Sequence, residues 1–467
     1  GSGLTSIVIP NVSTININTF NSCANLSSVT IPNTVGLIEY SAFANCSSLV
    51  SLTIPASVST IRTDSFTGTG ASLTSITVAA TNGSYMSENG VLFNKAKTTL
   101  WLYPSASLNT SYVIPSTVTS IKAYAFVGCS NLTSITIPNS VTSIPNFTFY
   151  RLTNALSSIV INANHTTYLS ENGVLFNKAK TTLMLYPPGL LNNSYVIPST
   201  VTSINSSAFS GCTNLTSVTI PSSVTLINDS TFFGCTNLTS VSIPTTLTSI
   251  DANAFSYCSS LTSVTFPASL LTIGVSAFSY CSSLTSVTIP ASVTSIGDEA
   301  FRNCTNVSSI TVADTNTNYL SENGILFNKA KTTLILYPPA SLNTSYVISS
   351  TLQSINAYAF NQCANLTTVS IPALATINDF TFTLCNLLST VIFLGDVLQI
   401  YSNNFTASGD TAVYINSTAN INASFKLSMF TNVISQNIPT LTNFPRIDIP
   451  FSNVPYKIPP PTTDMSG

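Results

Sequence analysis

Apolar and polar positions recur along this chain with a period of about 23 residues. The repeat is clearest over residues 215–306, where four consecutive segments follow the template LxxVxIPxxVxxIxxxAFxxCxx. The first part of each segment, LTSVTI or a close variant, has apolar residues at positions one, four and six. This spacing, with β-branched residues between, is typical of a short strand with one buried face. The proline that follows ends the strand because it has no N–H.

The second part of the template supplies the apolar residues that fill the space behind the strand. No single unit can bury its Val, Ile, Ala, Phe and Cys side chains alone, whereas stacked units bury them continuously. The pattern therefore predicts a solenoid, and we call one repeat of it a rung. Most anchor phenylalanines are 23 residues apart, and three gaps are wider; the anchors are Phe20, Phe43, Phe66, Phe126, Phe149, Phe209, Phe232, Phe255, Phe278, Phe301, Phe360, Phe382 and Phe405.

Each wider gap contains one copy of the stretch SENGVLFNKAKTTL. The copies occupy residues 87–100, 170–183 and 321–334, and the third has Ile325 in place of Val. In each copy Asn-Gly predicts a tight turn, and a VLFN or ILFN strand, a polar KAKT turn and a second strand follow. The sequence therefore predicts three inserted β-hairpin modules.

The charged residues of these modules have two interpretations. Glu88, Lys95 and Lys97, with their counterparts, are candidates for a ligand site used three times. Alternatively they form a solvated hairpin tip, where lysine discourages pairing of an exposed strand edge. We favour the second interpretation, because charge at a hairpin tip is the default.

Composition narrows the classes of partner. Only 6% of the 467 residues are charged and the net charge is −2, so there is no electrostatic footprint for nucleic acid or an anionic membrane. No run of eighteen apolar residues predicts a membrane-spanning segment. Outward strand positions are nearly all Ser or Thr, which predicts a hydroxyl-lined face for protein or glycan ligands; its candidate residues are Thr216, Ser217, Thr219, Thr285, Ser286 and Thr288.

The ten cysteines all stand three residues after an anchor phenylalanine, so they are expected to form one internal column. Leu152 occupies the same slot in another rung, which indicates that the slot is filled by volume. We therefore favour buried free thiols over disulfides between adjacent rungs. With no CxxC pair and no nearby histidine, the sequence gives no reason to expect zinc or another cofactor.

No catalytic constellation is visible. His165 is the single histidine, and Asn82 and Asn316 stand at its position in the other copies, so we expect it in a surface turn. No nucleophile lies at an interpretable spacing from it, and neither GxGxxG nor a P-loop occurs. We therefore predict a protein that is not an enzyme.

The sequence contains about twenty N-x-S/T sequons, where a dozen or so would occur by chance. Many lie in the CTNLTS turn, where the asparagine is expected to bond the backbone instead. The better candidates for N-glycosylation stand in loops before the SYVI strands, and they are Asn109, Asn192 and Asn343.

The repeats resemble those of the BspA-like (treponemal-type) leucine-rich-repeat family, LxxLxLPxxLxxIgxxAFxxCxx, over roughly residues 3–410. The resemblance implies a right-handed solenoid with a parallel sheet on one face. Members are typically secreted or displayed on bacterial and protist surfaces, where several act in adhesion or partner binding, and the family supplies no catalytic residues. We divide the chain into a solenoid, 1–410, and a C-terminal cap with an extended, proline-punctuated apolar arm, 411–467.

Three functions are compatible with these features. The first is an extracellular or cell-surface binding or adhesion protein. The second is a subunit of an extracellular filament, because Leu4, Ile7 and Ile9 already fit the template without an N-terminal cap, and an apolar arm can join a neighbouring copy. The third is ice binding by threonine rows, which the three insertions interrupt. The candidate assembly arm contains Phe444, Ile447, Ile449, Phe451 and Tyr456.

Overall fold

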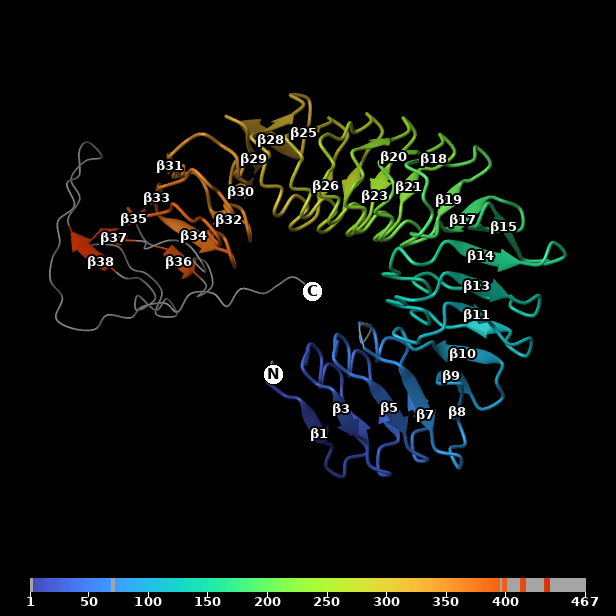
Figure 1. Cartoon of the computed structure of the whole chain (residues 1–467). Coiled ribbons are helices and arrows are strands. Elements are labelled where there is room, and N and C mark those ends of the chain that lie inside the picture. The colour runs from blue at the N-terminus through green and yellow to red at the C-terminus, as the bar shows by residue number, and fades with distance from the viewer. Residues whose placement is uncertain (1–2, 69–71, 395–396, 401–411, 417–431, 437–467) are drawn as a thin grey trace. The chain divides into compact units, whose positions relative to one another are not determined.

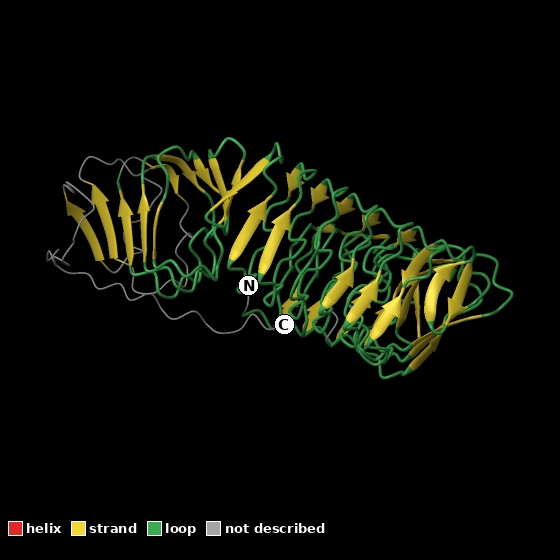
Figure 2. Ribbon diagram, turned by 90° about the horizontal axis from the view of Figure 1, so that it is seen from above, coloured by secondary structure: helices red, strands yellow, loops and turns green. Residues whose placement is uncertain are grey.

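The computed structural model describes residues 3–68, 72–394, 397–400, 412–416 and 432–436. The chain divides into two compact units, residues 1–238 and 239–467. Each unit is a solenoid of short strands and turns, and its described residues contain no helix (Figures 1 and 2). The predicted leucine-rich-repeat solenoid is therefore confirmed.

A first strand, which corresponds to LTSVTI, opens nearly every rung. Neighbouring first strands pair in parallel and in register, one repeat apart: Ser6 lies opposite Ser28, and Ser51 opposite Ser75. This confirms the predicted parallel sheet. The first strands of the first unit are β1 (Ser6–Val8), β3 (Ser28–Thr30), β5 (Ser51–Ile54), β7 (Ser75–Val78), β11 (Ser111–Val113), β13 (Ser134–Ile137), β14 (Ser158–Ile161), β18 (Ser194–Val196) and β20 (Ser217–Thr219).

The second unit continues the same arrangement. In the final described rungs of this unit, the first strands β35, β37 and β38 also pair in parallel, so the sheet extends past residue 410. The first strands of this unit are β22 (Ser240–Ser242), β25 (Ser286–Ile289), β27 (Ser309–Val312), β31 (Ser345–Val347), β33 (Thr368–Ile371), β35 (Thr390–Phe393), β37 (Ala412–Asn416) and β38 (Asn432–Gln436).

A shorter second strand, which corresponds to VTSI, follows in most rungs and also pairs in parallel. In the first unit these strands are β2 (Thr14–Ile15), β4 (Leu37–Ile38), β6 (Thr60–Ile61), β12 (Ser120–Ile121), β19 (Ser203–Ile204) and β21 (Leu226–Ile227). In the second unit they are β23 (Ser249–Ile250), β24 (Thr272–Ile273), β26 (Ser295–Ile296), β32 (Ser354–Ile355), β34 (Leu374–Ile377) and β36 (Val397–Ile400).

The anchor phenylalanines stack inside the solenoid. The ring centroids of Phe255 and Phe278 are 5.1 Å apart, those of Phe278 and Phe301 are 5.6 Å apart, and the planes differ by less than 10°. Phe20, Phe43 and Phe66 stack in the same way. The one-repeat spacing thus places each ring against the next and buries it from water.

The backbone around each anchor is held in an unusual conformation. Asn253 and Tyr257, two residues before and after Phe255, have φ values of 54° and 63°, in the left-handed region. Such a conformation costs about 1–2 kcal/mol for a residue other than glycine. The N–H groups of Asn253, Phe255 and Tyr257 donate to carbonyls of the following rung at 2.7–2.9 Å. These three hydrogen bonds help to offset the strain, so stacking of the next rung stabilises the turn.

Short polar side chains form a second set of bonds between rungs. Thr133 Oγ1 donates to the Thr110 carbonyl at 2.9 Å, and Ser140 Oγ donates to the Val118 carbonyl at 2.7 Å. Each donor and its acceptor are about one repeat apart, so an identical sequence position is used in successive rungs. The abundance of Ser, Thr and Asn is therefore structural as well as a means of wetting the surface.

The three sequence copies form three-stranded antiparallel sheets, which we call modules. In the first, Asn89 and Gly90 both have positive φ and join paired strands as a two-residue turn. The prediction of an inserted two-stranded hairpin after that turn is not confirmed, because the turn stands between the first two strands of each module. The module strands are β8 (Tyr85–Glu88), β9 (Val91–Asn94) and β10 (Thr99–Leu102); β15 (Tyr168–Glu171), β16 (Val174–Asn177) and β17 (Thr182–Leu185); and β28 (Tyr319–Glu322), β29 (Ile325–Asn328) and β30 (Thr333–Leu336).

The last strand of each module belongs to the solenoid itself. β10 pairs in parallel with β12, so it occupies the place of a second strand. The Tyr103 ring then stacks on Phe126 at 5.5 Å and fills the anchor position. Tyr186 and Tyr337 do the same against Phe209 and Phe360. Sequence reasoning missed these anchors, although each tyrosine precedes the next anchor by one repeat.

The prediction that His165 is a surface residue is wrong. Its side chain is fully buried, and its Nδ1 accepts hydrogen bonds from the backbone N–H groups of Thr167 and Tyr168. Asn82 does the same with its Oδ1, and its amide nitrogen also donates to the carbonyls of Pro55 and Val58. Histidine therefore replaces a buried asparagine clamp. Burial lowers the pKa of His165, the Pro138 carbonyl opposes this, and Lys178 lowers the pKa further.

The prediction of buried free thiols is confirmed: all ten cysteines are buried and unbridged. Cys281 Sγ donates to the Phe255 carbonyl at 3.2 Å, and Cys304 Sγ to the Phe278 carbonyl at 3.1 Å. Burial is the main reason that the pKa of Cys46 is raised to about 11 and that of Cys304 to about 12. These thiols stay protonated at neutral pH, so they are poor nucleophiles.

Replacement of an anchor ring tests the stacked core. We expect Phe278→Ala to destabilise the chain by about 3–5 kcal/mol, because it removes a fully buried ring from between two others. Urea unfolding followed by circular dichroism measures the change. Leu271→Ala, at a half-exposed position, is the control and should shift the midpoint little. Equal effects of the two variants would contradict the stacked column.

His165→Asn tests the buried clamp. Because burial lowers the folded-state pKa of His165, the unfolded chain takes up the proton first as the pH falls below about 6.5. Stability is therefore lost on acidification from pH 7.5 to 5.5, and His165→Asn should abolish that loss. The variant should also gain about 1 kcal/mol at neutral pH from an added hydrogen bond. Asn82→His is the reciprocal variant and should introduce a second acid-sensitive step; unfolding midpoints that do not respond to either change would refute the clamp.

Thiol titration tests the cysteine column. The folded protein should react slowly with a thiol reagent at pH 8, and the chain unfolded without reductant should show all ten thiols. Because folding raises the thiol pKa, stability should fall as the pH rises above about 9, where unfolded thiols ionise first. Cys304→Ala should weaken that alkaline loss. Fewer than eight thiols in the unfolded chain would indicate bridges and overturn the assignment.

Candidate binding face

The charged residues of the modules bind one another. Lys97 Nζ lies 2.6 Å from Glu88 Oε2, and the same pair forms between Lys180 and Glu171. The third module pairs its lysine and glutamate in the same way. Lys97 also lies over the Phe93 ring, 5.8 Å from its centroid. In each pair, the lysine and glutamate charges therefore neutralise each other at the module surface.

The other polar residues of the repeated stretch also have structural roles. Lys95 Nζ donates to the Ala80 carbonyl, and Asn94 Oδ1 accepts the N–H groups of Thr98 and Thr99 at 2.8 Å. Ser87 Oγ accepts the N–H of Val78, which joins the module to its own first strand. These contacts favour the structural interpretation of the modules over a repeated ligand site.

The predicted hydroxyl face lies on β20 and β25 and on the residues just before them. Thr219 and Thr288 point outward between buried neighbours and are exposed. Thr216 and Thr285 are exposed as well, and Ser217 and Ser286 lie beside them. Because β20 and β25 belong to different units, they provide two separate clusters of the same kind.

The structure divides these hydroxyls into two kinds. Thr216 Oγ1 donates to the Asn193 carbonyl at 2.9 Å, and Thr285 Oγ1 donates to the Thr262 carbonyl at 3.5 Å, so both link adjacent rungs. The hydroxyls of the two serines and of Thr219 and Thr288 make no hydrogen bond to the described residues. This second group is available to a ligand, whereas the first is engaged in the fold.

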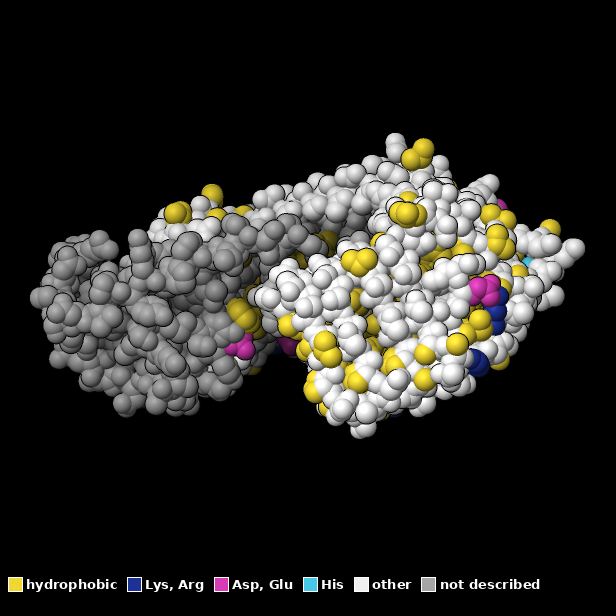
Figure 3. Space-filling view, turned by 60° about the horizontal axis from the view of Figure 1, so that its bottom comes forward, with side chains coloured by type: hydrophobic (Ala, Val, Ile, Leu, Met, Phe, Trp, Pro, Cys, Tyr) yellow, Lys and Arg dark blue, Asp and Glu magenta, His cyan; other side chains and the backbone are white. Residues whose placement is uncertain are grey.

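Because neighbouring first strands pair in register, the available hydroxyls form small regular arrays, which we call hydroxyl grids. Ser286 and Thr288 stand opposite Ser309 and Thr311 of the next rung. Neighbouring strands are about 4.8 Å apart, and alternate residues of one strand about 6.8 Å apart. Each hydroxyl both donates and accepts, so such a grid suits the closely spaced hydroxyl and amide groups of a glycan or a protein backbone. Charged side chains are sparse on the described surface seen in Figure 3.

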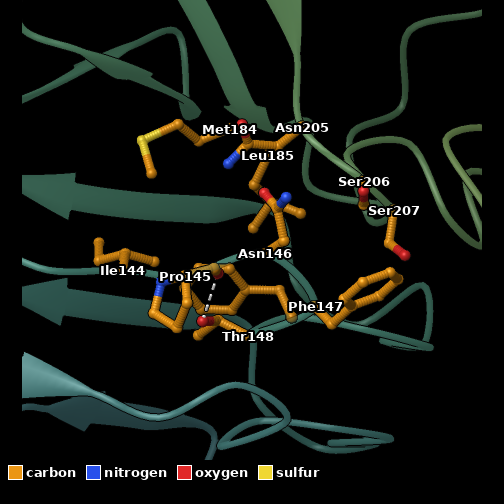
Figure 4. A pocket seen from close by; sticks show the side chains of 11 residues that line it. Ile144, Pro145, Asn146, Phe147, Thr148, Met184, Leu185, Asn205, Ser206 and Ser207 are labelled. Carbon is orange, nitrogen blue, oxygen red and sulfur yellow. Dashed lines mark hydrogen bonds between the residues drawn. The ribbon is translucent and has the colours of Figure 1, made fainter. Parts of the chain in front are cut away.

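Small cavities recur where a module meets the neighbouring rungs. The one in Figure 4 lies between Ile144–Phe149, Met184 and Leu185 of β17, and Asn205–Ser207, and its volume is about 10 Å³. Equivalent cavities of about 10 and 40 Å³ adjoin the first and third modules. Spaces of this size hold one to a few waters. They arise because the module rung lacks the usual anchor turn.

Of three arginines that sequence reasoning passed over, Arg62 and Arg302 line these cavities. Arg302 lies 3.8 Å from the centre of the Tyr358 ring and 2.9 Å from Glu299, and Tyr358 is on the far side of the third module in sequence. Arg151 and Arg62 stack on aromatic rings before the second and first modules. Their position in the sequence could have identified them, because each arginine precedes a copy of the repeated stretch by about one repeat. Their contacts are structural, and they brace the rungs around the missing turn.

The remaining predicted residues fall into two groups. Asn109, Asn192 and Asn343 are exposed in the loops before β11, β18 and β31. The candidate assembly arm lies outside the described residues.

Within residues 3–68, 72–394 and the shorter described segments, no group of three or more His, Cys, Asp or Glu side chains is placed to hold a metal ion. The described part of the chain also has no helix long and apolar enough to cross a membrane.

The family model for the BspA type leucine rich repeat region matches residues 1–94, 103–183, 190–323 and 340–448, which is most of the chain. No match was found among curated proteins. Solved structures similar to this chain include a leucine-rich cell-surface protein from Faecalibacterium prausnitzii, with 23% identity over 76% of this chain and 95% of that one and a TM-score of 0.43.

Two further solved structures are similar. A leucine-rich-repeat protein from Eubacterium ventriosum has 27% identity over 69% of this chain and 87% of that one, with a TM-score of 0.36. The pneumococcal vaccine antigen PcpA has 17% identity over 93% of this chain and 80% of that one, with a TM-score of 0.32. The extent of the family match, together with the stacked 23-residue rungs, shows that the chain belongs to the family of BspA-type leucine-rich-repeat proteins.

Proposed function

We propose that this protein is a non-enzymatic, extracellular or cell-surface binding protein that holds a glycan or protein ligand on the hydroxyl grids of its first-strand sheets. The observation that carries the proposal is the division of the exposed Ser and Thr residues into engaged and available groups. The half-buried Ser217 and the exposed Thr219, Ser286 and Thr288 keep their hydroxyls for a ligand.

Membership of a repeat family supports the proposal, because solenoids present extended surfaces that suit macromolecular ligands. The low charge supports it as well, since recognition on this face relies on short-range hydrogen bonds and apolar contact rather than on electrostatic steering. Val196 is 69% exposed directly opposite Thr219, so the face also offers apolar contact beside the hydroxyls.

A pair of variants in each unit separates binding from folding. We expect Ser286→Ala with Thr288→Val to weaken ligand binding about tenfold or more, since two hydrogen bonds of about 1 kcal/mol each are lost. Ser217→Ala with Thr219→Val makes the same change in the other unit. Binding to a glycan array and to a panel of purified extracellular-matrix proteins provides the measurement.

Thr285→Val and Thr216→Val are the matched controls. Each removes a hydroxyl from the same strand region, but the hydroxyl it removes links two rungs. These variants should lower the unfolding free energy by about 1 kcal/mol and leave the affinity of the folded protein nearly unchanged. The proposal fails if the wild-type protein binds no member of either panel, or if the controls lose as much affinity as the grid variants.

A further inference from the structure

Three sequons occupy the same place in the fold, next to the three modules. They are Asn109-Thr110-Ser111, Asn192-Asn193-Ser194 and Asn343-Thr344-Ser345, and each ends at the first residue of β11, β18 or β31. Every residue in these triplets is exposed. The fold therefore displays both the acceptor amide and the hydroxyl two residues later that a sequon requires.

The register shows why these asparagines lie outside the core. One repeat further along the chain the same position holds Leu132, Leu215 or Leu366, each at most 1% exposed. In the rung after a module this core leucine is replaced by asparagine. The residue just before it is a leucine that projects into solvent, with exposed fractions of 87%, 84% and 88% for Leu108, Leu191 and Leu342.

A serine two residues earlier holds the backbone of two of these asparagines: the N–H of Asn109 donates to Ser107 Oγ at 3.4 Å, and the N–H of Asn343 donates to Ser341 Oγ at 3.3 Å. The hydroxyl of Tyr103 donates to the same Ser107 Oγ at 3.2 Å, and the hydroxyls of Tyr337 and Ser341 are 3.3 Å apart. The tyrosine ring is the buried anchor of its module. In all three loops the asparagine itself is exposed, so a substituent on its amide nitrogen displaces no packed side chain.

The sequons of the CTNLTS-type turn are placed differently. Asn131 Nδ2 donates to the Ser107 carbonyl at 2.9 Å, Asn214 Nδ2 to the Leu190 carbonyl at 3.1 Å, and Asn365 Nδ2 to the Ser341 carbonyl at 2.9 Å. All three are half-buried. The nitrogen to which a glycan would be attached already faces a carbonyl of the module loop. These asparagines hold the very loops that present the exposed sequons.

We infer that Asn109, Asn192 and Asn343 are N-glycosylation sites and that Asn131, Asn214 and Asn365 are not. In the transfer, Nδ2 loses a proton and bonds to the anomeric carbon of a sugar. The bond from that carbon to a lipid-linked diphosphate breaks, and the diphosphate leaves with the electron pair. The lipid-linked oligosaccharide is the donor, and an oligosaccharyltransferase of the secretory route catalyses the transfer. The inference rests on the extracellular placement in the proposed function, but not on the ligand or on the hydroxyl grids.

Secretion of the full chain from a eukaryotic host tests the inference. The folded, secreted fraction is treated with peptide N-glycosidase F in ¹⁸O-water, which converts each glycosylated asparagine into labelled aspartate, and peptides are read by mass spectrometry. We expect label at the three module loops and none at the three turn asparagines. The triple variant N109Q/N192Q/N343Q should lose the mass of three glycans and retain the wild-type melting temperature.

The triple variant N131Q/N214Q/N365Q is the matched control. It should keep all three glycans and melt several degrees lower, because each substitution removes a bond between rungs. Unlabelled module loops in secreted, folded protein would overturn the inference, and so would label at the turn asparagines. Ligand binding by unglycosylated protein made in bacteria is measured separately, so a failure here is distinguishable from a failure of the proposed function.

Discussion

Hydrogen bonding between adjacent rungs is the interaction on which the rest of this structure depends. No rung satisfies its own backbone: the left-handed turns around Phe255 direct their N–H groups at the next rung, and Thr133 and Ser140 direct hydroxyls at the previous one. Because donor and acceptor are about one repeat apart, the same sequence position must recur in successive rungs. The period of the sequence is thus a requirement of hydrogen bonding as much as of the stacked phenylalanines.

The modules show how this requirement is met when a rung is interrupted. Extra chain enters between the first and second strands, but β10 restores the second strand and Tyr103 restores the anchor ring. The turn that should surround the anchor is missing, and a small cavity takes its place. Arg302, in contact with Tyr358, bridges the same gap at the third module. The charged residues of the modules do not line these cavities; they pair with one another within each module or bond a nearby carbonyl.

Periodicity in the sequence was sufficient to predict the solenoid and the buried cysteine column, because these follow from stacking alone, whereas the parallel sheet was expected from the family resemblance. It was insufficient for His165, whose burial depends on the Nδ1 that replaces the Oδ1 of Asn82. The nitrogen of a neutral imidazole and the oxygen of an amide can accept the same pair of backbone N–H groups, and the residue types alone do not reveal this equivalence. For the hydroxyl face, the exposure of Thr219 and Thr288 could be predicted from the alternation, but sequence could not separate Thr216 from Thr219, since only the structure shows which hydroxyl reaches a carbonyl.

The engaged and the available hydroxyls respond differently to substitution. Substitution at the Thr216 position breaks a bond between rungs and costs the fold about 1 kcal/mol, a loss that the fold tolerates in the rung where Val50 occupies this position. Substitution at the Thr219 position alters a hydroxyl that the fold does not use. Valine already occupies this column at Val113, Val196 and Val347 and is more than half exposed at each. Changes in the Thr219 column therefore cost the fold less than changes in the Thr216 column, so the surface chemistry of this face can change at the Thr219 column with little loss of stability.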